Sequence, residues 1–236
     1  VATAQFDVHN RILTLPMWEK ASNVVYDMLV GHEVGHALYT PDENWLKKKH
    51  IPPQFVNVVE DARIEKMMKR RYAGLSKTFY NGYKELNEQD FFAIADSNIA
   101  DLNLADRSNL YFKIGNFLKL TFTEEEDVIV KKIGEVETFD EVLDVAEELY
   151  LFCKKKIEEQ QEVEPPNSEQ NSPEAEEESE QQMPQGEIEN IDGEESEQQT
   201  QQQEEPQVET ADSLADNLEE LVDKHGSENT YCELPK

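Results

Sequence analysis

The chain has 236 residues, of which 52 are acidic and 22 are basic, so its formal net charge is −30. Most of this excess lies in residues 157–236, which contain 26 acidic and 2 basic residues, whereas residues 1–156 carry a net charge of only −6. A chain this acidic is a poor nucleic-acid binder, because phosphate binding requires lysines and arginines that displace counterions.

Membrane insertion and secretion are also not expected. No apolar run approaches the length of a membrane span, and no signal peptide opens the sequence. Two cysteines are too few for a disulfide framework. We therefore expect a cytoplasmic, intracellular protein with no nucleic-acid or membrane partner.

Two short runs near the N-terminus alternate between apolar and polar side chains. The runs Ala4–Val8 and Ile12–Leu15 flank a His-Asn-Arg turn and predict a β-hairpin. Two capping-box patterns, Thr123 with Glu126 and Thr138 with Glu141, predict later helix starts. Helical spacing of apolar residues predicts further helices over 18–39, 53–72, 76–86 and 106–120. The predicted fold class is mainly α with a small N-terminal β-hairpin.

The composition changes sharply near residue 160, which divides the chain. Residues 1–159 are predicted to form one helical domain. Residues 160–209 contain Glu, Gln, Ser and Pro with few apolar side chains, and are predicted to be a disordered acidic linker. A short amphipathic helix is predicted over 210–226, followed by a tail over 227–236. Because such a helix is marginal alone, its apolar face needs a partner in the helical domain or outside this chain.

The strongest functional signal is the sequence His32-Glu33-Val34-Gly35-His36, which matches H-E-x-x-H within a predicted helix. Residues four apart lie on one helical face, so His32 and His36 can present imidazole nitrogens to a single Zn²⁺. Glu33 lies beside the metal rather than on it, where its carboxylate can act as the general base for a zinc-activated water molecule. The pattern therefore predicts a zinc site with hydrolytic chemistry.

A catalytic zinc site needs a third protein ligand, and Glu60 is the favoured candidate. It lies 24 positions after His36 in the helix predicted over 53–72. It also shares a mixed helical face with Val56, Arg63 and Met67, which suits a half-buried site. A carboxylate on a second helix that packs against the first is the gluzincin arrangement.

Two alternatives to Glu60 remain open. Asp61 points about 100° away from Glu60 on the same helix, and Glu65 follows it one turn further on. Either of these two can instead orient a ligating imidazole through its second nitrogen. Asp42 is the other alternative, although Tyr39 stands where the longer pattern H-E-x-x-H-x-x-G requires glycine.

The remaining parts of a hydrolytic site are less specific in the sequence. The run Ile12–Leu15 is either an edge strand for an extended substrate or simply the edge of a small sheet. Hydrogen-bond donors for a developing oxyanion remain open among Tyr39, Arg63, Tyr72, Tyr80 and Tyr83.

Two segments together resemble a known family. The segment HEVGHALYTP (32–41) followed by NVVEDARIEKMMKRRY (57–72) resembles the zincin-like head of phage peptidases and of cobaltochelatase-type proteins that end in a von Willebrand factor A domain. The likeness covers roughly residues 1–90, and E-D-A-R-I-E is its more discriminating part. It implies a zincin-like α+β head, encoded by a phage. Because the D-x-S-x-S motif does not occur, it also implies that the von Willebrand A domain is absent and that the acidic tail is its upstream linker.

The motif and the resemblance predict a zinc metallopeptidase in which His32, His36 and Glu60 hold Zn²⁺ and Glu33 is the general base. Its partner would be a peptide or protein substrate. The alternative is a non-proteolytic zinc-binding adaptor, or a partner subunit of an AAA+ ATPase or metal-chelatase-type complex. Coordination distinguishes the two, because three protein ligands and an open position favour the enzyme, whereas a closed shell favours the adaptor.

Overall fold

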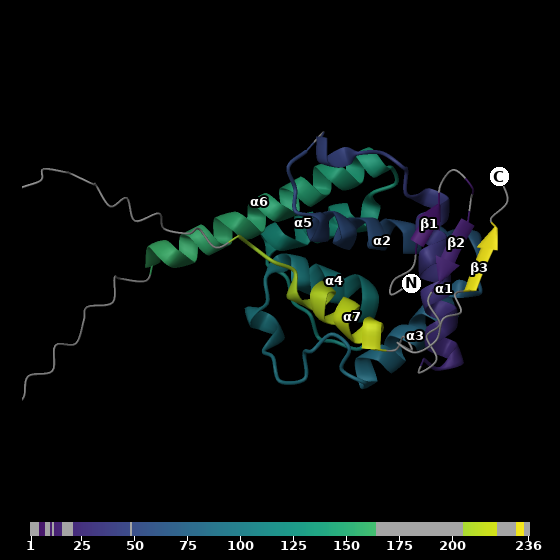
Figure 1. Cartoon of the computed structure of the whole chain (residues 1–236). Helices are drawn as coiled ribbons and strands as arrows, with labels where there is room; N and C mark the ends of the chain where they lie inside the picture. Colours follow the sequence, from purple (N-terminus) through teal and green to yellow (C-terminus); the bar gives the residue numbers. More distant parts are fainter. Residues whose placement is uncertain are drawn as a thin grey trace, which may run out of the picture.

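The computed structural model describes residues 5–7, 10, 12–15, 21–47, 49–163, 205–220 and 230–233. These residues are mainly helical, as predicted (Figure 1). The helices are α1 (Asn23–Tyr39), α2 (Pro53–Arg71), α3 (Leu75–Glu88), α4 (Leu104–Ile114), α5 (Glu124–Glu135), α6 (Phe139–Val163) and α7 (Glu209–Glu220). The strands are β1 (Gln5–Asp7), β2 (Ile12–Leu15) and β3 (Thr230–Glu233), and short 3-10 turns lie at Trp45–Lys47 and Ile99–Asp101.

The N-terminal strands form the predicted hairpin and gain a third strand. β1 pairs antiparallel with β2, placing Phe6 opposite Leu13, and β3 pairs antiparallel with the other side of β2, placing Cys232 opposite Leu13. The sheet order is β1-β2-β3, so β2 is the central strand. The expectation that Ile12–Leu15 is an edge strand is therefore wrong, because this chain itself pairs both hydrogen-bonding sides of β2.

Local signals in the sequence set several helix boundaries. The Ser22 hydroxyl accepts a hydrogen bond from the backbone N–H of Val25, so α1 begins at Asn23, later than the predicted start; residues 16–20 lie outside the described part. The predicted capping box of Thr123 and Glu126 is present with both of its hydrogen bonds. α2 begins at Pro53, where a proline needs no N–H partner, and ends with basic residues that complement the helix dipole.

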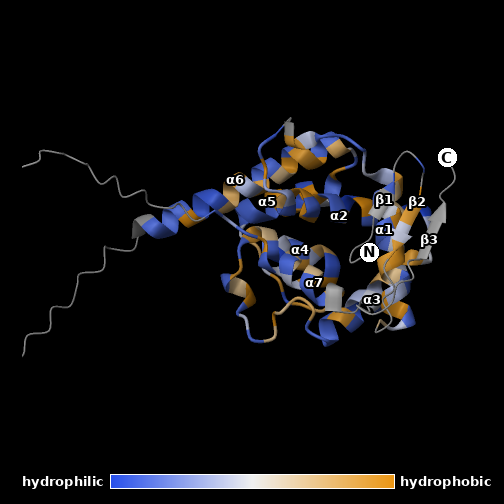
Figure 2. Ribbon diagram, in the orientation of Figure 1, coloured by the Kyte–Doolittle hydropathy of each residue, from blue (hydrophilic) through white to orange (hydrophobic). Residues whose placement is uncertain are grey.

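The apolar core of the described residues falls into two clusters. One gathers buried side chains of α2, α5 and α6, including Phe55, Ile133 and Leu149. The other joins β2, α1, α3 and α4, including Met28 and Phe79. In Figure 2 apolar residues are spread over the packed helices, whereas the projecting end of α6 is mainly hydrophilic. Of the helices that the structure describes, none is both long and apolar enough to cross a membrane.

α7 packs against α4, and its apolar residues Leu214 and Leu218 pack against the second cluster. Val208, just before the helix, is completely buried in the first cluster. The backbone N–H and the hydroxyl of Thr210 both donate to Oδ1 of Asp106, at 2.8 Å each, and the Asn109 amide donates to the Thr210 hydroxyl. Val208, predicted to lie in the linker, is thus part of the packed fold, and α6 extends past the predicted boundary at 159. Residues 164–204 and 221–229 lie outside the described part.

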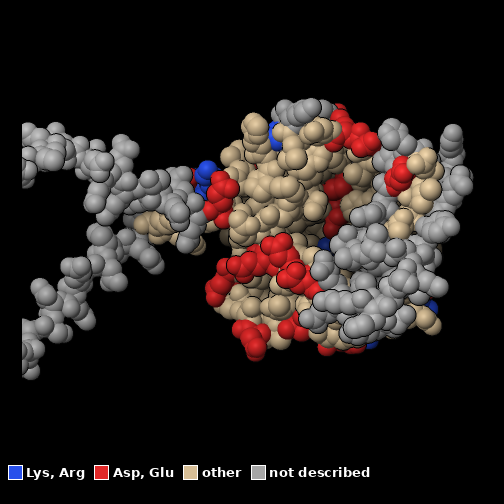
Figure 3. Space-filling model, viewed as in Figure 1, with Lys and Arg blue, Asp and Glu red and all other residues tan. Residues whose placement is uncertain are grey.

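The outer face of the α7 segment is acidic. Figure 3 shows acidic atoms gathered over the start of α7, and further acidic atoms are visible deeper in a hollow of the same face. The exposed residues of the segment include Glu205, Glu209, Asp212 and Asp216.

Docking of α7 buries Asp106, and we expect this burial to make stability depend on pH. Burial raises the pKa of Asp106 to about 6; the hydrogen bonds from Thr210 oppose the increase, and the charges of Glu209 and Asp212 add to it. An unfolded aspartate has a pKa of about 3.9, so the folded state binds this proton more tightly. The contribution of Asp106 to the free energy of unfolding is therefore present at low pH and lost as the pH rises from about 4 to 6, by up to about 3 kcal/mol.

The measurement is urea denaturation of the wild type and Asp106→Asn, each at about pH 4 and pH 8. The amide keeps the shape and the acceptor oxygen but does not titrate. From pH 4 to pH 8, the free energy of unfolding of the variant should increase by up to about 3 kcal/mol relative to that of the wild type. If the difference in unfolding free energy between variant and wild type were the same at both pH values, the expected cost of burying ionised Asp106 would be contradicted.

Candidate metal centre

The helix that carries the H-E-x-x-H sequence is packed closely between α2 and α3. A Cβ atom at Gly35 would lie 3.1 Å from Ile64 Cδ1 and from Met68 Cγ of α2. A Cβ atom at Gly82 of α3 would lie only 2.5 Å from Met28 Cβ of α1. Because neither glycine carries a side chain, α2 approaches the backbone of α1 at Gly35, and Met28 of α1 approaches the backbone of α3 at Gly82. Gly35, within the motif itself, thus allows α2 to bring its polar side chains to the two histidines.

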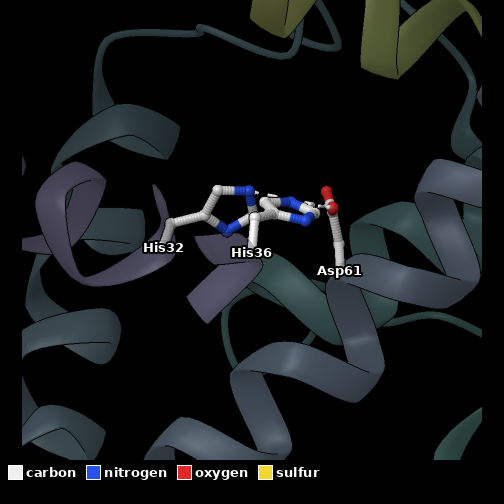
Figure 4. A group of neighbouring side chains, drawn as sticks. All are labelled: His32, His36 and Asp61. Carbon is white, nitrogen blue, oxygen red and sulfur yellow. Dashed lines mark hydrogen bonds and ion pairs between the residues drawn. The ribbon is translucent and has the colours of Figure 1, made fainter. Parts of the chain in front are cut away.

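His32, His36 and Asp61 form the group that could hold a metal ion. Each offers one ligand atom, and these atoms lie within 4.8 Å of one another. Asp61 Oδ1 is 3.2 Å from His36 Nε2 and 3.7 Å from His32 Nε2. Figure 4 shows both imidazole rings, from α1, turned toward the Asp61 carboxylate, from α2. The three side chains are partly buried, which suits a site that keeps one side open to a ligand.

The second nitrogen of His32 is held by a buried carboxylate. Nδ1 of His32 lies 3.2 Å from Oε1 of Glu65, and the Tyr83 hydroxyl donates to the same oxygen at 2.5 Å. A hydrogen on Nδ1 that donates to Glu65 leaves the Nε2 lone pair free to bind a metal. The structure thus gives Glu65 the orienting position that the sequence allowed for it.

The second nitrogen of His36 is held through a hydroxyl. Nδ1 of His36 is 3.0 Å from Thr40 Oγ1, and this hydroxyl donates to Oε1 of Glu60 at 2.5 Å. Because the Thr40 hydroxyl gives its only hydrogen to Glu60, it can accept the Nδ1 hydrogen of His36. Nε2 of His36 then also faces Asp61 with a free lone pair, so both rings present the same atom to the site.

Glu60, the favoured third ligand from the sequence, is not part of the group, and this expectation is corrected. Its side chain is buried, and its two carboxylate oxygens accept 2.7 Å hydrogen bonds from Nε and Nη2 of Arg63. The reason is the rotation of α2 about its axis. Asp61 and Glu65, four residues apart, face His36 and His32, also four residues apart, across helices that run in opposite directions here. Glu60 lies about 100° away on α2 and points toward Arg63 and Thr40 instead.

A buried lysine from α4 joins the polar network around Asp61 and Glu65. Nζ of Lys113 is 2.8 Å from Asp61 Oδ2, 3.3 Å from the Tyr83 hydroxyl and 3.9 Å from Glu65 Oε1. Since Oδ2 of Asp61 is occupied by this hydrogen bond, the carboxylate offers only Oδ1 to the histidine side. Asp61 is thereby oriented as a one-atom ligand.

These charges shift the pKa values of the cluster in a consistent way. Burial opposes the charged form of Asp61, but Lys113 and His32 outweigh it and hold the pKa of Asp61 well below its usual range. Burial likewise opposes ionisation of Glu65, but the hydrogen bond with His32 and the charge of Lys113 lower its pKa to about 2. Burial and the charge of Glu65 raise the pKa of Tyr83 well above its ordinary value, so its hydroxyl remains a donor. Both carboxylates are therefore ionised at neutral pH.

Glu33 stands apart from this network. It is partly buried on α1 and forms no hydrogen bond or ion pair with another described residue. Its charge nevertheless adds to the raised pKa values of Tyr83 and Lys113. For Tyr83 the larger causes are burial, Glu65 and Asp61, whereas for Lys113 Asp61 and Glu65 outweigh burial, which lowers the pKa. Its carboxylate is thus in electrostatic range of the cluster.

The other sequence candidates lie elsewhere. Asp42 is exposed in the loop after α1 and does not belong to the metal-binding group of the described residues. Tyr72 and Tyr80 are exposed. The Arg63 guanidinium donates hydrogen bonds to Glu60 and to the carbonyl oxygen of Tyr39. Of the proposed oxyanion donors, Tyr83 donates its hydroxyl hydrogen to Glu65, the carboxylate that holds Nδ1 of His32.

Sequence reasoning missed Lys113 and Thr40. Lys113 carries one available signal, because it lies three residues after the buried Leu110 and so shares the inward face of α4. A lysine on such a face needs an acidic partner in the interior. Thr40 carries no comparable signal, since threonine is common where a helix ends.

The donor set fits a divalent metal of the zinc type. Two imidazole nitrogens and one carboxylate oxygen are the ligand types and the ligand number of catalytic zinc sites, which keep a fourth position for water or substrate. Hydrogen bonds to the second nitrogen of each imidazole are also typical of such sites. Comparisons of this chain with protein-family models, with curated proteins and with solved structures find no match.

Proposed function

We propose that this chain is a zinc-dependent metallopeptidase in which His32, His36 and Asp61 hold the ion. The observation that carries the proposal is the convergence of one atom from each of these residues within 4.8 Å. Asp61 replaces Glu60 in this ligand set, because Glu60 is bound to Arg63 on another face of α2. When bound there, Zn²⁺ would supply a Lewis acid that activates water and polarises a substrate carbonyl.

Each neighbouring residue has a separate task in this proposal. Glu65 and Thr40 fix the two imidazole rings through their Nδ1 atoms. Lys113 fixes Asp61 through Oδ2. Glu33, which has no partner among the described residues, accepts a proton from the attacking water and returns it to the leaving amine.

The substrate class comes from the resemblance of residues 32–41 and 57–72 to the zincin-like heads of phage peptidases. That resemblance supports peptide-bond hydrolysis in particular, because the ligand geometry by itself supports any metal-assisted hydrolysis. A zincin-like α+β fold is part of the same proposal. The assignment of the acidic tail as the linker upstream of a von Willebrand A domain also rests on that resemblance.

The direct test is the zinc content of the purified chain, measured by elemental mass spectrometry, together with cleavage of a randomised peptide library. The wild type should hold one zinc ion per chain and cleave peptides. Asp61→Asn should lose most of the zinc, whereas Glu60→Gln should keep it. Zinc that persists in Asp61→Asn but is lost in Glu60→Gln would contradict the proposed ligand set.

The same experiment separates the second candidate, a non-proteolytic zinc-binding adaptor or a partner subunit of an AAA+ ATPase or chelatase-type complex. Full zinc occupancy without cleavage of any library peptide would favour that role over the peptidase.

A further inference from the structure

α4 carries a stripe of polar side chains along a buried face. Asp106, Asn109 and Lys113 are spaced by three and four residues, so they lie on one side of the helix. Each is buried, at 1%, 2% and 9% exposure respectively. Asp106 and Asn109 bind Thr210 of α7, whereas Lys113 reaches the metal centre. The stripe thus brings one buried cation to the carboxylates of Asp61 and Glu65.

Two carboxylates, those of Asp61 and Glu65, surround the buried ammonium group of Lys113. Lys113 contacts Asp61 at 2.8 Å and Glu65 at 3.9 Å, and the Glu65 side chain is only 4% exposed. Lys69 also pairs with Glu65, at 3.0 Å, but its side chain is 32% exposed. Lys113 is therefore the most buried cation that touches Asp61 or Glu65 among the described residues. Buried carboxylates without a nearby positive charge are strongly unfavourable.

We infer that Lys113 is the resident cation of the metal-free centre: its ammonium group neutralises Asp61 and Glu65, so the helices can pack before a metal ion binds. A metal ion that arrives later shares Asp61 with this ammonium group. Lys113 therefore stabilises the metal-free chain and weakens metal binding by electrostatic repulsion. The inference rests on the proposed metal centre but does not depend on peptide hydrolysis.

The test is Lys113→Met, which keeps most of the side-chain volume and removes the charge. The chain is prepared with zinc, stripped with a chelator, and melted with and without added Zn²⁺. Stripped Lys113→Met should melt well below the stripped wild type, because Asp61 and Glu65 lose their shared cation. Added zinc should raise the melting temperature of the variant by more than it raises that of the wild type. Zinc affinity, measured by competition with a fluorescent chelator, should increase at least about tenfold.

Lys49→Met is the matched control. Lys49 also lies between two carboxylates, 2.6 Å from Asp144 and 2.6 Å from Glu147, but both are on α6 and neither belongs to the metal centre. Its removal should leave the zinc-induced shift and the zinc affinity unchanged. If it instead increased both as Lys113→Met does, a general charge effect would account for the result, and the inference would be overturned.

Two further results for Lys113→Met would overturn the inference. If the substitution lowered the melting temperature equally with and without zinc, Lys113 would stabilise the fold without affecting metal binding. A smaller zinc shift with weaker affinity would mean that it chiefly orients Asp61 for the ion. A wild type that binds no zinc would remove the proposed metal centre and this inference together, whereas zinc binding without cleavage would remove only the peptidase proposal.

Discussion

Replacing Glu33 by glutamine should leave zinc bound and lower the rate of peptide hydrolysis by about 10²–10⁴-fold. Glu33 is outside the metal-binding group, so the amide should not disturb the ligands. The glutamine amide cannot accept a proton at neutral pH. The other described carboxylates near the site, Asp61 and Glu65, are both paired with Lys113 and cannot take over this role. The loss should therefore appear in kcat rather than in metal content.

The measurement combines zinc stoichiometry with the initial rate of cleavage of a peptide found in the library. Asp27→Asn is the control, because Asp27 is an exposed acid on the same helix that lines an apolar groove with Val30 and Val34. It should leave the rate within about twofold of the wild type. Full activity of Glu33→Gln with zinc bound would rule out Glu33 as the general base.

Replacing Arg63 by methionine should lower the free energy of unfolding by about 3–5 kcal/mol. The Arg63 guanidinium is 3% exposed and holds both carboxylate oxygens of Glu60, which is itself 2% exposed. It also donates to the backbone carbonyls of Tyr39 and Glu137. Methionine would leave the Glu60 carboxylate buried with only the Thr40 hydroxyl as a partner, and an uncompensated buried charge is costly.

Urea denaturation at neutral pH measures this loss, and a second substitution identifies its source. Glu60→Gln added to Arg63→Met removes the stranded charge, so the double variant should be more stable than Arg63→Met alone. A loss below about 1 kcal/mol in Arg63→Met would indicate that Glu60 turns to solvent. In that case Glu60 would also be free to approach the histidines, and the correction to the ligand set would need revision.

Several elements were predictable because their signals are local. The capping box at Thr123 and Glu126, the proline at the start of α2 and the alternation in Ile12–Leu15 each act within a few residues, so the helix starts and the strand follow from the sequence. The pairing of His32 with His36 is of the same kind. Residues four apart on a helix face the same way whatever the helix packs against.

The third member of the group was not predictable in this way. Glu60 and Asp61 are adjacent in the sequence and chemically equivalent as ligands, and they differ only in direction on α2. Which of them meets the histidines depends on the rotation of α2, and this is set by contacts such as those of Ile64 and Met68 with the backbone of Gly35. The docking of α7 is a similar case, because Thr210 finds its partners Asp106 and Asn109 on α4 across about a hundred positions of sequence.

The sequence by itself thus determined the mainly helical class, the helix that carries His32 and His36, and the presence of a candidate base at Glu33. Only the tertiary structure decided that Asp61 joins them, that Glu60 is held by Arg63, and that Lys113 from α4 enters the site. The physical reason is that helical periodicity fixes relative directions within one helix. The directions between helices are fixed by packing, which depends on side chains far apart along the chain.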